Sequence, residues 1–273
     1  MSSFKNKNKI LSKKNRYEQK IINKDINYNL FKDINISICV HCANLAIFKE
    51  LLSYITNFEL FQWNTLHLIF NVVIDLVDYN EINNLIKNTF KNNNTVITII
   101  KSKNKGLDIG GFLRCLDYVK EDVHIISKIH TKGRQGWRRG MMKIFTKEGI
   151  YNSIKLLYFE KIGMVGNNNQ LWDFYKDVNM SYQNKLNIIC NIMKINFSEI
   201  KLHKSFLIGG TIFMCKKNIL NDVIKYRHIL YTYCNDKDNY YKNPSSFKFE
   251  LTMERLFGYL VYHYNKNIVG LIS

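Results

Sequence analysis

Short apolar runs alternate along this chain with segments whose apolar residues recur every three or four positions. The run at 34–42 (INISICVHC) is rich in Ile and Val, which is typical of a buried strand. The next segment places Leu45, Phe48, Leu51, Leu52 and Ile55 on one face of a helix. The same alternation predicts strands at 63–73, 95–102 and 123–130 and helices at 81–90 and 110–119. Such alternation predicts an α/β fold with a central, mainly parallel sheet flanked by helices.

The second half of the chain is less regular. Strands are expected at 161–166 and around Gly209-Gly210 within 205–217, where one bent strand or two strands fit the pattern. Helices are expected at 138–145, 151–159, 218–230 and 250–264, an irregular helical stretch at 167–201, a loop at 233–246 and a strand or tail at 267–273. Residues 1–32 are rich in Lys and Asn and predict a basic, solvated leader. Residues 33–273 are expected to form one Rossmann-like domain.

Composition limits the classes of function that the sequence supports. The net charge is +18, but lysine is spread along the whole chain, and we find no RNA-binding aromatic signature or zinc-finger spacing. We therefore expect no nucleic-acid partner. Cys39 and Cys42 form a CxxC without a second pair, so the six cysteines are expected to be reduced structural thiols. No apolar run is long enough to span a membrane and the N-terminus lacks an apolar signal segment, which favours a cytoplasmic protein. The basic N-terminus leaves a peripheral membrane contact open.

Candidate chemistry gathers between residues 104 and 139. Asp108 lies among Gly106, Gly110 and Gly111, where the backbone can approach a ligand closely. The apolar strand at 123–130 then ends in His-Thr-Lys-Gly-Arg. Open α/β sheets bind ligands at the carboxyl ends of their strands. Cations and a histidine at that edge favour an anionic ligand, and a diphosphate in particular.

Each of these residues also has a structural interpretation. Lys128, His130 and Lys132 alternate along a strand and share one side, which either contacts a ligand or is a solvated face. Asp108 either contacts a donor molecule or caps the following helix. His41 ends the first strand, so it either joins the same site or makes a structural hydrogen bond. Asn104 lies at the same edge of the predicted sheet.

Five segments resemble, in order, blocks of the rhamnan synthesis protein F family. They are NKGLDIGGFL (104–113), SKIHTKGRQGWRR (127–139), KIGMVGN (161–167), FLIGGTIFMCKKNIL (206–220) and FELTMERLFGYL (249–260). The similarity extends from about Ile34 to Gly270. It implies a GT-A-like glycosyltransferase that moves a sugar, with L-rhamnose or another deoxyhexose favoured, from a nucleotide diphosphate donor to a glycan hydroxyl.

The resemblance also implies roles for residues. GT-A enzymes typically hold a divalent metal with Asp-x-Asp after the fourth strand, where this chain has His130-Thr131-Lys132. We therefore expect no required metal, and manganese or magnesium is less favoured. The expected donor-binding residues are His41, Asn104, Gly106, Asp108, His130, Lys132 and Arg138. Gly209, Gly210 and Thr211 are expected to border the acceptor or, alternatively, to form a β-bulge.

The general base is expected on the late amphipathic helix. Glu250 and Glu254 are four residues apart on one face near its start, with Glu254 preferred. Both could instead be charges favoured by the helix dipole. Trp137 is expected to be a core residue or an acceptor platform. The alternative function from another class is a non-catalytic, basic nucleic-acid-binding or scaffold protein on a degenerate transferase fold.

Overall fold

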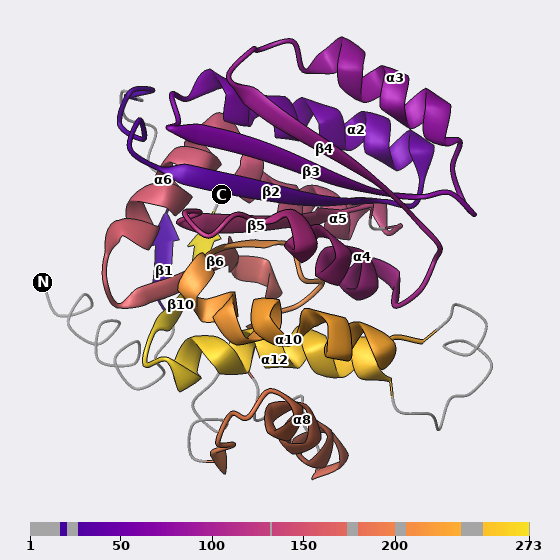
Figure 1. Cartoon of the computed structure of the whole chain (residues 1–273). Coiled ribbons are helices and arrows are strands. Elements are labelled where there is room, and N and C mark those ends of the chain that lie inside the picture. The colour runs from indigo at the N-terminus through magenta and orange to yellow at the C-terminus, as the bar shows by residue number, and fades with distance from the viewer. Residues whose placement is uncertain are drawn as a thin grey trace, which may run out of the picture.

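The computed structural model describes residues 17–20, 27–131, 133–173, 180–199, 206–235 and 248–272. Its centre is an eight-stranded sheet with the order β4-β3-β2-β5-β9-β6-β10-β1 (Figure 1). The strands are β1 Tyr17–Lys20, β2 Asn35–Cys42, β3 Thr65–Val73, β4 Thr95–Ser102, β5 Ile125–His130, β6 Ile162–Asn167, β9 Phe213–Lys216 and β10 Asn267–Ile272. A separate pair consists of β7 Leu171–Asp173 and β8 Phe206–Ile208.

Neighbouring strands run parallel except around β9, which is antiparallel to both β5 and β6. The predicted α/β fold with a central, mainly parallel sheet is therefore confirmed. The segment 205–217 contains two strands, β8 and β9, separated by a turn at Gly209-Gly210. The turn takes β8 out of the main sheet and reverses the chain, so β9 enters between β5 and β6 from the opposite direction.

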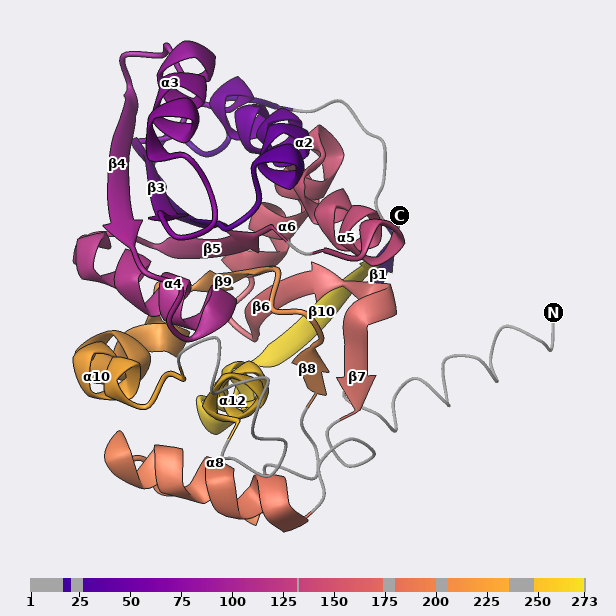
Figure 2. The same ribbon diagram turned by 90° about the vertical axis from the view of Figure 1, so that its right-hand side faces the viewer.

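The helices cover both faces of the sheet (Figures 1 and 2). Helices α2, α5 and α6 pack with one face into one apolar core, and α4, α10 and α12 pack with the other face into a second core. The helix bounds are α2 Leu45–Ile55, α3 Tyr79–Thr89, α4 Leu107–Cys115, α5 Gln135–Met142, α6 Lys147–Tyr158, α8 Met180–Ile192, α10 Asn221–Thr232 and α12 Phe249–His263. Short 3-10 helices are η1 Thr56–Leu60, η2 Leu116–Tyr118, η3 Lys143–Phe145, η4 Asn168–Gln170 and η5 Lys217–Leu220.

Successive side chains of strand β2 point to opposite faces of the sheet, so the strand contributes residues to both cores. Ile36, Ile38 and Val40 belong to the core beneath α2 and α3. Cys39 belongs to the opposite core, and His41 lies on that same side beneath α4. A strand buried on both faces reads as a continuous apolar run, which is why 34–42 could be recognised from the sequence.

Helix α4 lies unusually close to β2. A Cβ atom added to Gly111 would lie 2.0 Å from Nδ1 of His41, and one added to Gly110 would lie 1.9 Å from the carbonyl oxygen of Lys105. Real Cβ atoms do not approach other atoms that closely, so both positions need glycine. Gly111 therefore lets α4 approach the end of β2, and Gly110 lets the loop at Lys105 pack against the start of the helix.

The structure differs from expectation before Ile34 and in the region 167–201. Strand β1 lies within the predicted leader and pairs with β10, and Phe31 is fully buried against Trp63 and Tyr151. The described sheet and core thus use residues earlier than the predicted domain start. The short strand β7 was not expected, because its partner β8 lies far along the chain.

The six cysteines are buried and form no disulfide with one another. Cys39 and Cys42 belong to cores on opposite faces of the sheet, so this CxxC is not a metal-binding pair. Among the described helices, none combines the length and apolar character needed to cross a membrane.

Candidate functional site

At β2 the sheet grows in both directions, because strands that follow β2 in the chain lie on both sides of it. Strand β3, the next strand along the chain, pairs on one side of β2, and β5 pairs on the other. Such a switch point opens a crevice at the carboxyl ends of the two strands, where open α/β sheets bind ligands. His41 and His130 are register partners at that end of β2 and β5. The position of the crevice thus follows from topology.

Asp108 lies at the centre of the crevice, in the first turn of α4. Its Oδ2 atom lies 2.6 Å from Nζ of Lys128, 2.7 Å from Oγ1 of Thr211 and 3.6 Å from Nε2 of His130. The side chain remains 23% exposed. Asp108 therefore joins α4, β5 and the β8–β9 turn while it is still accessible to a small molecule.

Lys128 is a buried cation in the middle of the sheet. Its side chain is only 1% exposed, and its Nζ donates to Asp108 and, at 2.7 Å, to the hydroxyl of Thr211. The ammonium also lies 5.7 Å from the centre of the Phe112 ring. A lysine charge is buried in this way only when it is paired and hydrogen-bonded.

The electrostatics of the cluster keep Asp108 ionised. Burial alone would raise the pKa of the Asp108 carboxyl. The charges of His130 and Lys128, with hydrogen bonds from Lys128 and Thr211, outweigh burial and hold that pKa well below its usual range. Asp108 is therefore a poor general base, and its charge is largely matched by its neighbours.

The β8–β9 turn closes the cluster from the other side. The carbonyl of Gly210 lies 2.7 Å from Nε2 of His130, and its N–H donates to Oε1 of Glu254 on α12. The hydroxyl of Thr211, next in the chain, accepts from Lys128 and donates to Asp108. Asp108, His130, Gly210, Thr211 and Glu254, all predicted site residues, are thus brought together.

Two pairs of residues with left-handed backbones meet at this cluster. Gly106 and Leu107 have φ values of 72° and 51°, directly before Asp108, and Gly210 and Thr211 have φ values of 81° and 52°. Positive φ is costly for Leu and more so for β-branched Thr. Such strain persists where the surroundings overdetermine it, and it gathers at functional sites. The first turn positions Asp108, which is a member of the ion pair with Lys128, and the second positions Thr211, which contacts both members of the pair.

His41 forms the wall of the cluster beneath α4. Its Nδ1 lies 3.1 Å from the side-chain amide nitrogen of Asn71, and it is 6% exposed. Burial lowers the pKa of His41 to about 4, an effect that the Lys128 charge strengthens and the Asp108 charge opposes. His41 is therefore neutral at pH 7 and contributes a hydrogen-bonding group.

Other predicted site residues have contacts outside the cluster. Arg138 is buried, with Nη2 2.5 Å from Oε2 of Glu50 on α2. Both carboxylate oxygens of Glu250 accept hydrogen bonds from Asn235, at 2.8 and 3.1 Å. The Asn104 N–H donates to Asp75. These contacts hold loops in place, so ligand or catalytic roles for Arg138, Glu250 and Asn104 stay predictions.

Two predicted glycines shape the approach to the cluster. The N–H of Gly106 donates to the carbonyl of Asn235, which ties the start of α4 to the end of α10. Gly209 lies so close to the Trp172 indole that a Cβ atom would come within 2.6 Å of it. Lys132 lies outside the described residues. Within the described part of the chain, no group of three or more His, Cys, Asp or Glu side chains is arranged to hold a metal ion.

An aromatic wall borders the β8–β9 turn. Trp137 on α5 and Trp172 on β7 stack with ring centres 6.1 Å apart and planes 16° from parallel. Both are half-buried. A Cβ atom at Gly210 would contact Trp137, and one at Gly209 would overlap Trp172. The two glycines therefore let the tryptophan pair pack directly against the turn.

Comparison with known proteins assigns this chain to no family. No protein-family model matches this sequence, and no curated protein matches it. Among solved structures, 4-diphosphocytidyl-2C-methyl-D-erythritol synthase from Anaerococcus prevotii is similar over 88% of this chain and 86% of that one. The identity is 10% and the TM-score 0.41, a likeness that assigns neither ligand nor reaction to this chain. The resemblance to the rhamnan synthesis F family stays a prediction.

The sequence predicted Lys128 only as part of a strand face that either contacts a ligand or is solvated, and Lys128 was not among the expected donor-binding residues. The alternation with His130 correctly placed the two side chains on one side of the strand, but β5 is not an edge strand, and Lys128 is buried. The available signal was a lysine within an otherwise apolar strand, since such a charge requires a partner. Nothing local to 123–130 identifies that partner as Asp108.

The low pKa of His41 predicts a pH dependence of stability. The unfolded chain binds a proton at His41 below about pH 6.5 and the folded chain only near pH 4, so stability falls as pH falls across that window. Each such histidine contributes a slope of up to about 1.4 kcal/mol per pH unit. Urea unfolding between pH 7.5 and 4.5 should therefore show a shallower loss of stability in His41→Gln than in the wild type. An equal loss of stability per pH unit in the wild type and in His41→Gln would contradict a lowered pKa of His41. His67, whose pKa burial also lowers, is the comparison histidine, and His67→Gln should flatten the remaining slope.

Proposed function

We propose that the protein is a glycosyltransferase that moves a sugar from a nucleotide diphosphate donor to a glycan hydroxyl. The observation that carries the proposal is the cluster of Lys128, Asp108, Thr211 and His130 at the carboxyl ends of β2 and β5. An α/β fold binds its ligand at that place. A scaffold protein would have no need of a strained, buried, charged cluster there, since such groups cost stability.

The cluster has no unmatched carboxylate to hold a metal, so the proposed donor binds without one. In a metal-dependent site, two carboxylates hold a cation against the diphosphate. Here the Asp108 carboxylate is already matched by Lys128 and His130. His130 and Lys132, the latter assigned from the sequence alone, would supply hydrogen bonds and positive charge to the phosphates. A required metal is therefore not part of the proposal.

The acceptor would approach from the β8–β9 turn. Thr211 belongs to the donor cluster, and Gly209 and Gly210, which precede it in the turn, pack against the stacked Trp172 and Trp137. Aromatic side chains beside a polar turn suit a sugar, which has apolar faces and hydroxyl edges. L-Rhamnose or another deoxyhexose as the transferred sugar rests on the family resemblance, and a different sugar on the same fold is the nearest rival.

Glu254 is the proposed general base. It lies in the first turns of α12, is only half-buried, and contacts the N–H of Gly210 at the junction of the donor and acceptor regions. The attacking hydroxyl must lose its proton as it bonds to the anomeric carbon, so a carboxylate within hydrogen-bond reach is needed. Glu250 is the weaker candidate because Asn235 already occupies both its oxygens.

A donor panel tests the proposed reaction. Purified protein is incubated with nucleotide diphosphate sugars that differ in base and sugar, with and without a chelator, and release of the nucleoside diphosphate is measured. We expect release from one donor class, unchanged by the chelator. Lys132→Ala should weaken binding of the nucleoside diphosphate by about tenfold or more, but binding of the nucleoside little, because a charge-assisted phosphate contact is worth roughly 1.5–3 kcal/mol.

Two results would count against this account. Strict dependence on manganese or magnesium would indicate that Asp108 binds a metal. Absence of turnover and of nucleoside diphosphate binding across the panel would favour the non-catalytic alternative.

Glu254→Gln tests the base. Glutamine keeps an oxygen that can accept from the Gly210 N–H, so the fold and donor binding should be preserved. Turnover should fall by roughly 10²–10⁴, the usual loss for a general base. Glu250→Gln is the matched control: it disturbs the Asn235 contacts and should lower stability, with near-normal turnover of the folded protein. The reverse pattern would exchange the two roles, and full activity in both variants would place the base elsewhere.

A further inference from the structure

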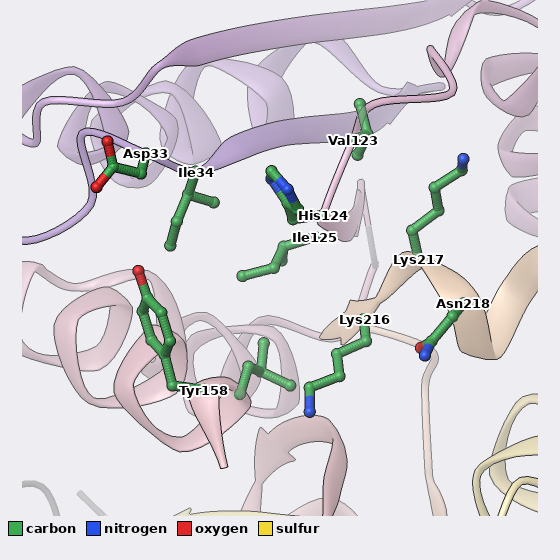
Figure 3. Close-up of a pocket in the computed structure, with 10 residues that line it drawn as sticks. Asp33, Ile34, Val123, His124, Ile125, Tyr158, Lys216, Lys217 and Asn218 are labelled. Carbon is green, nitrogen blue, oxygen red and sulfur yellow. The ribbon is translucent and has the colours of Figure 1, made fainter. Parts of the chain in front are cut away.

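A cavity of about 550 Å³ lies at the amino ends of β2 and β5 (Figure 3). The register of these strands runs from Ile36 beside Ile125 at this end to His41 beside His130 at the other. The cavity is thus at the opposite edge of the sheet from the Asp108 cluster, and it shares no residue with it. Its lining is Asp33, Ile34, Val123, His124, Ile125, Leu157, Tyr158, Lys216, Lys217 and Asn218.

The floor of the cavity is apolar. Ile34, Val123, Ile125 and Leu157 are buried in the surrounding protein. Tyr158 adds an aromatic wall and is 58% exposed, which is unusual for a large ring. A space of this size, mostly apolar with a few polar groups, has the character of a small-molecule site.

Two lysines line one side of the cavity, and their ammonium groups point away from each other (Figure 3). Nζ of Lys216 donates to the carbonyls of Phe159 and Glu160, and Nζ of Lys217 donates to the carbonyl of Glu121. These are backbone acceptors, and within the described residues neither lysine has an ion pair with a carboxylate. Burial and the charge of Lys266 lower the pKa of Lys216 despite the opposing effect of Glu160. An ammonium in this setting would gain from an added anion.

The remaining polar groups can orient a ligand. Nδ1 of His124 accepts from the N–H of Asn35 at 3.0 Å, so the proton of its neutral ring is on Nε2, the other nitrogen. Asp33 lies across the cavity from Lys217 and Asn218, near the Tyr158 hydroxyl (Figure 3). The cavity is therefore cationic on one side and acidic on the other, with an apolar floor between.

We propose that this cavity binds a small amphipathic anion, with its acidic group at Lys216, an apolar body over Ile125 and Leu157, and a hydrogen-bond donor toward Asp33. The inference does not rest on the proposed transferase activity. It assigns the chain a second ligand site, separate from the crevice at the carboxyl edge.

The fluorescent compound 6-hydroxy-2-naphthoate is a suitable probe, because it combines a carboxylate, a flat apolar body and a hydroxyl. Its binding to the whole protein is followed by fluorescence anisotropy. We expect saturable binding with one site per chain, and at least about tenfold weaker binding of the methyl ester, which lacks the charge. 2-Naphthoate, which lacks the hydroxyl, should bind less tightly than the probe.

Surface variants locate the bound probe without disturbing the core. Tyr158→Ala should weaken binding of both acid and ester, because it removes the wall they share. Lys216→Gln should weaken binding of the acid and leave the ester little changed. Lys87→Gln, on α3 away from the cavity, is the charge-matched control and should change neither.

Three results would overturn the inference. The first is equal affinity for the acid and the ester. The second is an affinity for the probe that neither Tyr158→Ala nor Lys216→Gln changes. The third is a probe that no longer binds to Asp108→Asn but still binds to Tyr158→Ala. The last result would place the probe in the crevice at the carboxyl edge. Because these measurements use no sugar donor, they are independent of the outcome of the donor panel.

Discussion

The ion pair between Lys128 and Asp108 is the interaction on which the rest of the site depends. A lysine charge with 1% exposure costs several kcal/mol to remove from water, and the cost is offset only by close, well-satisfied partners. Asp108 and the Thr211 hydroxyl supply them. These partners come from α4 and from the β8–β9 turn, so satisfying one charge on β5 fixes three separate segments relative to one another.

That constraint explains the strained backbone around the pair. The left-handed residues at 106–107 bring Asp108 toward β5, and those at 210–211 bring Thr211 toward it. The Gly210 peptide then offers its carbonyl to His130 and its N–H to Glu254. Glycine at 111 lets α4 approach until His41 packs beneath it. An apolar residue at 128 would avoid the cost of burying a charge, and we propose that the ion pair is present because it positions the site for its ligand.

The fold was more predictable than the site. Strand–helix alternation in the first half depends on local period, and β2, β3, β4 and β5 all lie within or close to their predicted ranges. The antiparallel direction of β9 could not be predicted, because it depends on a turn at Gly209-Gly210 that packs against Trp172 and Met141, which are distant in sequence. The pairing of β1 with β10, which lie near opposite ends of the chain, likewise leaves no local pattern. Asp108, His130 and Thr211 were identified because they follow glycines or end an apolar strand. Lys128 was predicted to share a strand face with His130, but its burial and its pairing with Asp108, 20 residues away, leave no local pattern in the sequence.

The central claim is that the Lys128–Asp108 pair is kept for ligand binding, and a double-mutant cycle tests it most directly. Lys128→Met, Asp108→Asn and the double variant are compared by urea unfolding and by calorimetric titration with a panel of nucleoside diphosphates. We predict that Lys128→Met alone loses roughly 3 kcal/mol, because it removes the lysine partner of a partly buried carboxylate, and that the double variant regains most of this stability. The regained stability should come without any recovery of nucleoside diphosphate binding. A double variant that binds the nucleotide as tightly as the wild type would contradict the account and reduce the pair to a structural contact.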